Sequence, residues 1–213
     1  MRKGMKIMGT VLEMDRKRKK YFDYSQKGVE DKITQYLNTI IKTEKDITIL
    51  CIGTDRSTGD CLGPLVGLFL KNMEARCEVL GDLHNPIHAQ NLDMINTKSN
   101  YVIVVDACLG TPENVGNIMV KPSGITPGSG VGKKITGEEL GNTSILPIVN
   151  FGGCMDFFIL QNTRLSMVYK QAQVVAKSLY QFIQKRKRNK ELLGQQTLWE
   201  LEGNYAGNIL TKN

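Results

Sequence analysis

Two aspartates lie where α/β proteins commonly place catalytic side chains. Asp60 follows the largely apolar run 47–52 and a turn that contains Gly53 and Gly59, and Asp106 directly follows the apolar run 101–105. Short runs rich in β-branched residues are typical of strands buried on both faces of a parallel sheet. Ligands of open α/β sheets bind beyond the carboxyl ends of the strands. If the two strands are neighbours, both carboxyl groups face one crevice.

Such a pair of carboxyl groups can work as a general acid and a general base. Mutual repulsion and partial burial raise the pKa of one group, so that it keeps a proton beside an ionised partner. The structural alternative is that Asp60 and Asp106 only cap the helix or turn that follows each of them, as aspartates often do. The spacing alone leaves both interpretations open.

A glycine-rich loop at 124–132 is the second candidate for chemistry. Closely spaced glycines free backbone amides to surround an anion or to bind the backbone of a peptide. We therefore expect Gly128, Ser129 and Gly130 to contact substrate. The loop does not match the Walker phosphate-binding motif, because Pro127 stands where the first glycine of that motif is required.

Other nucleophiles and metal ligands have weaker support. The possible nucleophiles are Cys61, Ser57, Thr58 and Ser129. Each would need a neighbouring base, and the chain has only two histidines, His84 and His88. Pro86 lies between them and disfavours one continuous helical face that could hold a metal. We expect neither a cofactor nor a metal.

The hydrophobic periodicity around these residues predicts a three-layer α/β fold, a mostly parallel sheet flanked by helices. Residues 1–27 are expected to form a basic, poorly ordered arm, residues 28–190 a single α/β domain, and residues 191–213 a C-terminal tail. We expect helices at 29–43, 62–75, 87–96 and 165–187, and strands at 47–52, 78–81, 101–105, 117–121 and 145–149.

Composition restricts the classes of partner. The net charge of +7 arises from basic residues in 1–20 and 185–190, whereas the rest of the chain has more acidic than basic residues. We therefore do not expect the body to bind nucleic acid. No apolar run approaches the roughly 18 residues of a membrane span, and no signal-peptide segment is apparent. Five cysteines without a C-x-x-C spacing indicate reduced thiols and a cytoplasmic protein without a membrane partner.

Three motifs resemble, in this order, those of spore germination proteases. They are 53–66, with Asp60 seven residues after its first glycine, 104–107 around Asp106, and the loop 124–132. By length and motif context the chain is identified as a member of the YyaC-like sporulation proteins, relatives of that protease and of hydrogenase maturation endopeptidases. The resemblance covers roughly residues 47–160. It implies a hydrogenase-maturation-protease-like fold and a sporulation-associated endopeptidase in the cytoplasm of the sporulating cell or forespore.

The resemblance also implies roles for single residues. Asp60 and Asp106 would be catalytic, and Gly53 and Thr54 would bind substrate. Thr126 stands where the germination proteases usually have a histidine, so any role of that histidine is absent here. The metal-dependent maturation endopeptidases use a histidine as third ligand beside their two acids, and this chain has no evident equivalent. We therefore expect an enzyme that hydrolyses peptide bonds without an essential metal.

Two alternatives come from other classes of protein. One is a non-catalytic member of the fold that binds a protein. The other is a peptidyl-tRNA hydrolase-like esterase, although the asparagine- and histidine-bearing motifs of that class are not apparent. A protein or peptide substrate is the expected partner, and the sequence leaves a homo-oligomer open.

Overall fold

The parallel strands that precede the two aspartates lie in the middle of one mixed sheet. The computed structural model describes residues 18–88, 90–95, 100–126 and 139–210. Within these residues seven strands pair in the order β1-β6-β7-β4-β2-β3, with β5 beside β7. The strands are β1 Lys20–Asp23, β2 Ile47–Cys51, β3 Glu78–Leu80, β4 Tyr101–Val105, β5 Cys108–Gly110, β6 Asn117–Lys121 and β7 Thr143–Phe151. Strands β3, β2, β4, β7 and β5 pair in parallel. At one side β6 pairs antiparallel with β7, and β1 pairs antiparallel with β6, so the predicted mostly parallel sheet is confirmed.

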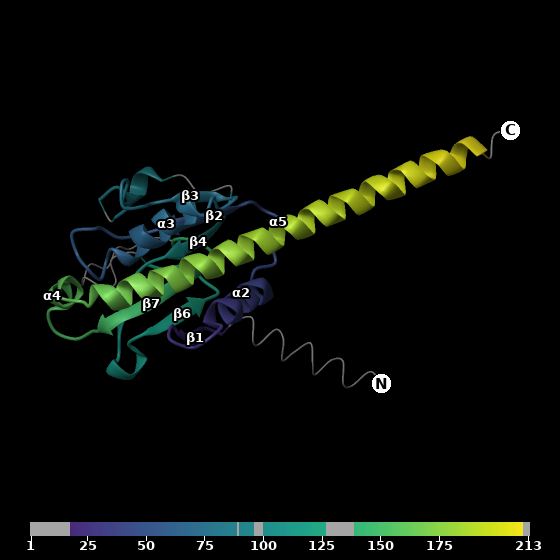
Figure 1. Cartoon of the computed structure of the whole chain (residues 1–213). Helices are drawn as coiled ribbons and strands as arrows, with labels where there is room; N and C mark the ends of the chain where they lie inside the picture. The colour runs from purple at the N-terminus through teal and green to yellow at the C-terminus, as the bar shows by residue number, and fades with distance from the viewer. Residues whose placement is uncertain (1–17, 89, 96–99, 127–138, 211–213) are drawn as a thin grey trace.

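Three helices cover one face of this sheet. They are α2 Val29–Ile40, α3 Leu62–Asn72 and α5 Leu165–Leu210, and α5 contacts the other two (Figure 1). Alternate strand residues such as Ile49 and Cys51 pack against these helices. The next residues along the strand, Leu50 and Ile52, point to the opposite face, as the period of two in a strand requires.

The opposite face is covered by connecting segments. Leu50 and Val104 pack there with Ile87 and Ile125. The prediction of a helix over 87–96 is wrong, because the described residues of that segment contain a 3-10 turn, η1 Leu92–Met94, and no α-helix. The Asn91 side chain explains the difference: it accepts a hydrogen bond from the His88 amide at 2.8 Å and donates one to the Pro86 carbonyl at 3.0 Å. Such side-chain bonds compete with those of a helix.

Near both ends of the described chain, the structure contains regular elements beyond those that we predicted. Residues 20–23, predicted as part of a poorly ordered arm, form β1 and pair with β6, so that part of the prediction is wrong. Phe22 of this strand contacts Tyr36 of α2, with ring centroids 5.8 Å apart. At the other end α5 continues to Leu210 and projects beyond the sheet (Figure 1). The division into arm, domain and tail otherwise stays a prediction.

Two shorter elements complete the description. Helix α4 Asp156–Gln161 follows β7, and a 3-10 turn, η2 Pro112–Asn114, lies between β5 and β6. None of the described helices combines the length and hydropathy that a membrane span requires.

Candidate active site

The strands that lead to the two aspartates are direct neighbours. Strands β2 and β4 pair in parallel with Cys51 opposite Val105, and the Ile52 amide continues the pairing by donating to the Val105 carbonyl at 2.8 Å. On the other side of β4, the Asp106 amide donates to the Ile145 carbonyl of β7 at 3.3 Å. Both aspartates therefore follow strands that end at the same edge of the sheet, as the sequence analysis required.

Gly53 allows the turn that carries Asp60. Its φ of +143° is rare for residues with a side chain, and a Cβ built on it would lie 1.9 Å from the Asp60 carbonyl oxygen. The Thr54 amide donates to that same carbonyl at 3.2 Å. The turn is also held from α4, because the Gly59 amide donates to the Leu160 carbonyl at 2.8 Å. The backbone around Asp60 is thus fixed from two sides.

The capping alternative does not account for Asp60. Helix α3 begins at Leu62 after Cys61, and no side chain caps it by a hydrogen bond. The carboxyl group of Asp60 is therefore not used at the start of α3.

Burial and repulsion give the two carboxyl groups different proton affinities. Burial, and next the charge of Asp60, raise the pKa of Asp106 to about 8, against a smaller opposing effect of the Ala107 amide. Burial also raises the pKa of Asp60, and the Ser57 hydroxyl partly opposes this. At neutral pH Asp106 therefore keeps its proton, partly because the charge of the nearby Asp60 raises its pKa. This is the arrangement that a general acid and base pair needs.

Ser57 is a site residue that sequence reasoning weighed only as a nucleophile. Its side chain is buried, and within the described part of the chain its hydroxyl makes no hydrogen bond of normal length and angle. The hydroxyl is near enough to Asp60 to lower the pKa of that carboxyl group. Its place beside Asp60 depends on the turn geometry, which no local sequence signal reveals.

The thiols near the pair are poor nucleophiles. Burial raises the pKa of Cys61, and the charge of Asp60 raises it further. The Cys61 thiol donates to the Thr58 carbonyl at 3.0 Å. Burial, together with the charge of Asp106, raises the pKa of Cys108 to about 12. Neither group is a thiolate at neutral pH, which disfavours a cysteine mechanism.

The donor set does not fit a metal. Among the residues that the structure describes, no group of three or more His, Cys, Asp or Glu side chains is placed to hold one. His84 is exposed, and its backbone amide donates to Asp82, a residue engaged with Lys71. Two carboxyl groups without a third ligand are a poor match to the sites that bind transition metals.

The predicted substrate-binding residues are only partly described. Gly53 and Thr54 lie in the turn that carries Asp60, whereas Gly128, Ser129 and Gly130 lie outside the described residues. The base of their loop is anchored, because Ile125 and Leu140 exchange two backbone hydrogen bonds of 3.0 and 2.8 Å. That these residues bind substrate, and that Asp60 and Asp106 are catalytic, stays a prediction.

Four large apolar side chains are exposed at the end of β7, the strand next to β4, and in the residues that follow it. Phe151, Met155, Phe157 and Phe158 are each at least half exposed, and we call them the apolar rim. Leu160, on the same short helix as Phe157 and Phe158, contacts Gly59 of the Asp60 turn. Exposed apolar patches of this kind commonly mark binding surfaces. Sequence reasoning missed this one, because it predicted no helix at 156–161.

The fold and the site define an α/β protein with an acid pair at the carboxyl edge of its parallel strands. The model of the family described as "Protein of unknown function (DUF1256)" matches residues 21–178, and the chain belongs to this family. This chain is 40% identical over 184 residues to "Uncharacterized protein YyaC" of Bacillus subtilis (strain 168). The alignment covers 82% of this chain and 89% of that protein. The predicted membership of the YyaC-like proteins is confirmed.

One solved structure shows a weak similarity to this chain. It is the [NiFe] hydrogenase maturation protease HycI from Thermococcus kodakarensis KOD1, with a TM-score of 0.44 and 17% sequence identity over 66% of this chain and 93% of that chain. A similarity this low carries no functional argument, so the proposal below depends on the geometry of this chain.

Proposed function

We propose that the protein is an endopeptidase that hydrolyses peptide bonds with the pair Asp60 and Asp106. One observation carries this proposal: the two carboxyl groups follow neighbouring parallel strands, and Asp106 has a pKa of about 8, partly because of the charge of Asp60. The pair then holds one proton at neutral pH. A protonated and an ionised carboxyl group side by side can activate water and polarise a carbonyl at the same time.

The two aspartates take different roles in this mechanism. The ionised Asp60 accepts a proton from water as the water oxygen attacks the scissile carbonyl carbon. The protonated Asp106 donates a hydrogen bond to the carbonyl oxygen, where negative charge develops. The carbon–nitrogen bond then breaks as the amine nitrogen receives the proton from Asp60, which returns to the carboxylate. The products are a carboxylic acid and an amine, and no step requires a metal.

A polypeptide substrate agrees with the surroundings of the pair. The apolar rim offers exposed aromatic and thioether side chains on the segment that follows β7, and extended peptides bind to such surfaces through their apolar side chains. The order of the three sequence motifs supports a setting in the cytoplasm of a sporulating cell or forespore. A protein of that compartment is the proposed substrate.

The test is proteolysis of a spore-extract protein pool across a range of pH. Wild type, Asp60→Asn and Asp106→Asn are compared with and without a chelator, and Asp31→Asn, an exposed substitution on α2, is the matched control. We expect cleavage that resists the chelator, persists in the control and is lost in both site variants. Absence of cleavage by the folded wild type would overturn the proposal in favour of a protein-binding role. Cleavage that the chelator abolishes would overturn the metal-independent mechanism.

A further inference from the structure

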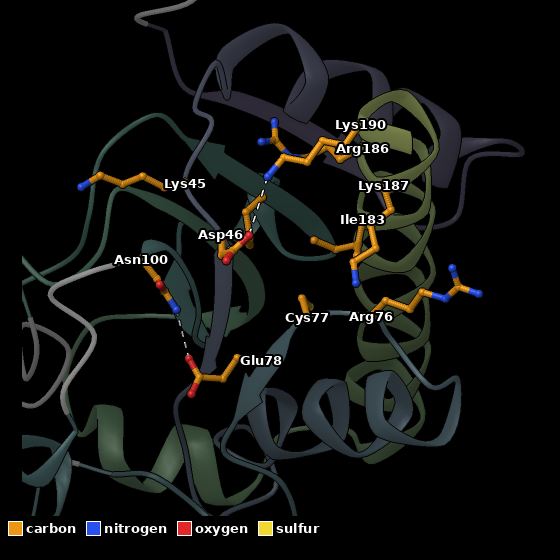
Figure 2. A pocket seen from close by; sticks show the side chains of 11 residues that line it. Lys45, Asp46, Arg76, Cys77, Glu78, Asn100, Ile183, Arg186, Lys187 and Lys190 are labelled. Atoms are coloured by element: carbon orange, nitrogen blue, oxygen red, sulfur yellow. Dashed lines mark hydrogen bonds and ion pairs between the residues drawn. The ribbon is translucent and has the colours of Figure 1, made fainter. Parts of the chain in front are cut away.

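A cavity of about 400 Å³ lies at the edge of the sheet opposite the two aspartates. Figure 2 shows the side chains that line it. It is lined by Ile47 at the start of β2, Glu78 at the start of β3 and Asn100 just before β4. These are the amino ends of three parallel strands, whereas the aspartates follow the carboxyl ends. The five residues of β2 separate the two edges by about 16 Å. The cavity is therefore distinct from the candidate active site.

Cations dominate the lining of this cavity, which we call the basic pocket. Three of them come from α5, where Arg186, Lys187 and Lys190 share the helix face of Ile183 and lie along one side of the cavity (Figure 2). Two more, Lys45 and Arg76, come from the loops that enter β2 and β3. The carboxylates in the lining are only Asp46 and Glu78.

Both carboxylates already have partners. Glu78 accepts hydrogen bonds from Thr48 at 2.6 Å and from Asn100 at 3.4 Å. Asp46 forms an ion pair with Lys190 at 3.7 Å. Within the pocket these carboxylates neutralise only part of the positive charge.

Two of the cations are not engaged. The side-chain ammonium groups of Lys45 and Lys187 have no hydrogen-bond or ion-pair partner among the described residues. In contrast, the Arg186 guanidinium donates to the Thr43 carbonyl, and the Lys190 ammonium donates to the Glu44 carbonyl. The thiol of Cys77 does not compensate Lys187. Burial raises the pKa of this thiol to about 11, although Lys187 opposes the shift, so the thiol is neutral at pH 7. The pocket keeps an excess of positive charge.

The shape of the pocket fits a small ligand. Its volume falls within the range of about 300–1,000 Å³ of small-molecule sites. Ile47 and Ile183 are buried and give it an apolar floor. An adjoining cavity of about 380 Å³ shares Arg76 and Lys187 and continues along α5 with more basic than acidic side chains. Its one carboxylate, Glu191, forms an exposed ion pair with Arg76 at 3.8 Å. Guanidinium groups bind phosphate oxygens through paired hydrogen bonds, and lysines add point charges.

From this charge excess and shape we infer that the basic pocket binds a small ligand carrying two or more phosphate groups. Such a ligand supplies several negative charges within one small volume, which matches cations that reach the cavity from α5 and from two loops. Both a nucleotide and an inorganic polyphosphate have this chemistry. A nucleotide would also place its base on the apolar floor.

The experiment is calorimetric titration of the full chain at about 150 mM salt, where screening suppresses long-range attraction. Inorganic tripolyphosphate and adenosine triphosphate are the two probes. Lys187→Gln and Lys45→Gln remove the unengaged charges. Lys177→Gln is the matched control, because it makes the same charge change at an exposed position of α5 outside the pocket.

We expect each pocket variant to weaken binding at least about tenfold, the effect of losing one hydrogen bond between charged groups, and the control to change it less than about twofold. Asp46→Asn should tighten binding, because it removes a competing carboxylate. Tighter binding of adenosine triphosphate than of tripolyphosphate would identify a nucleotide, and equal binding a phosphate chain; both support the inference. No saturable binding of either probe, or equal effects of the pocket and control variants, would overturn it.

Discussion

Because folded Asp106 keeps its proton at neutral pH, we predict that the free energy of unfolding depends on pH. The folded chain holds this proton up to a pKa of about 8, whereas an unperturbed aspartate releases it near 3.8. Between these values the folded state binds more protons than the unfolded state, so the free energy of unfolding falls as the pH rises. A pKa difference of about 4 units between the folded and unfolded chains changes the free energy of unfolding by at most ~6 kcal/mol. Water that penetrates the site reduces this change to roughly half.

Asp106→Asn replaces the carboxyl group by a neutral group of similar shape. At pH 5 wild-type Asp106 is protonated, so the two proteins should differ by about 1 kcal/mol or less. At pH 8.5 the wild type carries a buried charge and the variant does not, so the variant should be the more stable by about 2–4 kcal/mol. The gain in stability should be accompanied by loss of peptide hydrolysis.

Urea unfolding of both proteins from pH 5 to pH 8.5 measures this difference. Asp31→Asn, on the exposed face of α2, makes the same chemical change without burial and should show no such trend. A difference between wild type and Asp106→Asn that stays constant over this range would refute the reasoning, because it would mean that Asp106 ionises in the folded chain as it does in the unfolded chain.

Three further predictions concern the same edge of the sheet. Asp60→Asn should lower the pKa of Asp106, because it removes a repelling charge. Carbon NMR of the carboxyl groups would measure this pKa, and an unchanged value would mean that the two groups do not interact. Gly53→Ala should destabilise the fold by about 3 kcal/mol or more in urea unfolding, because its Cβ meets the backbone at 1.9 Å. Gly153→Ala, where a Cβ meets nothing within 4 Å, is the control and should change stability by less than about 0.5 kcal/mol. Phe158→Ala should raise the KM for peptides several-fold without loss of stability, and an unchanged KM would remove the apolar rim from the substrate site.

The errors of the sequence analysis have particular causes. The helix expected over 87–96 is replaced by turns, because one side chain, Asn91, bonds to the backbone of its neighbours. The segment 20–23 is too short and too closely surrounded by charges to show a period, yet β6 provides a strand for it to pair with. In both cases a contact outside the periodic pattern decided the local conformation.

The candidate site was predictable to the extent that it depends on the ends of strands. The apolar runs before Gly53 and Asp106 and the glycine turn after the first of them are local features, and they placed both aspartates at carboxyl ends. The involvement of Ser57 and the exposure of Phe158 were not predictable, because each depends on how the Asp60 turn and α4 pack together.

The sequence by itself determined the α/β class, the parallel strands and the two residues on which chemistry is proposed, because hydrophobic periods and glycine turns are set by neighbours along the chain. Only the tertiary structure decided that β2 and β4 are adjacent, that burial and the charge of Asp60 raise the pKa of Asp106, and that cations from α5 meet the amino ends of the strands. Adjacency, burial and electric field depend on residues far apart in the sequence, which no local pattern encodes.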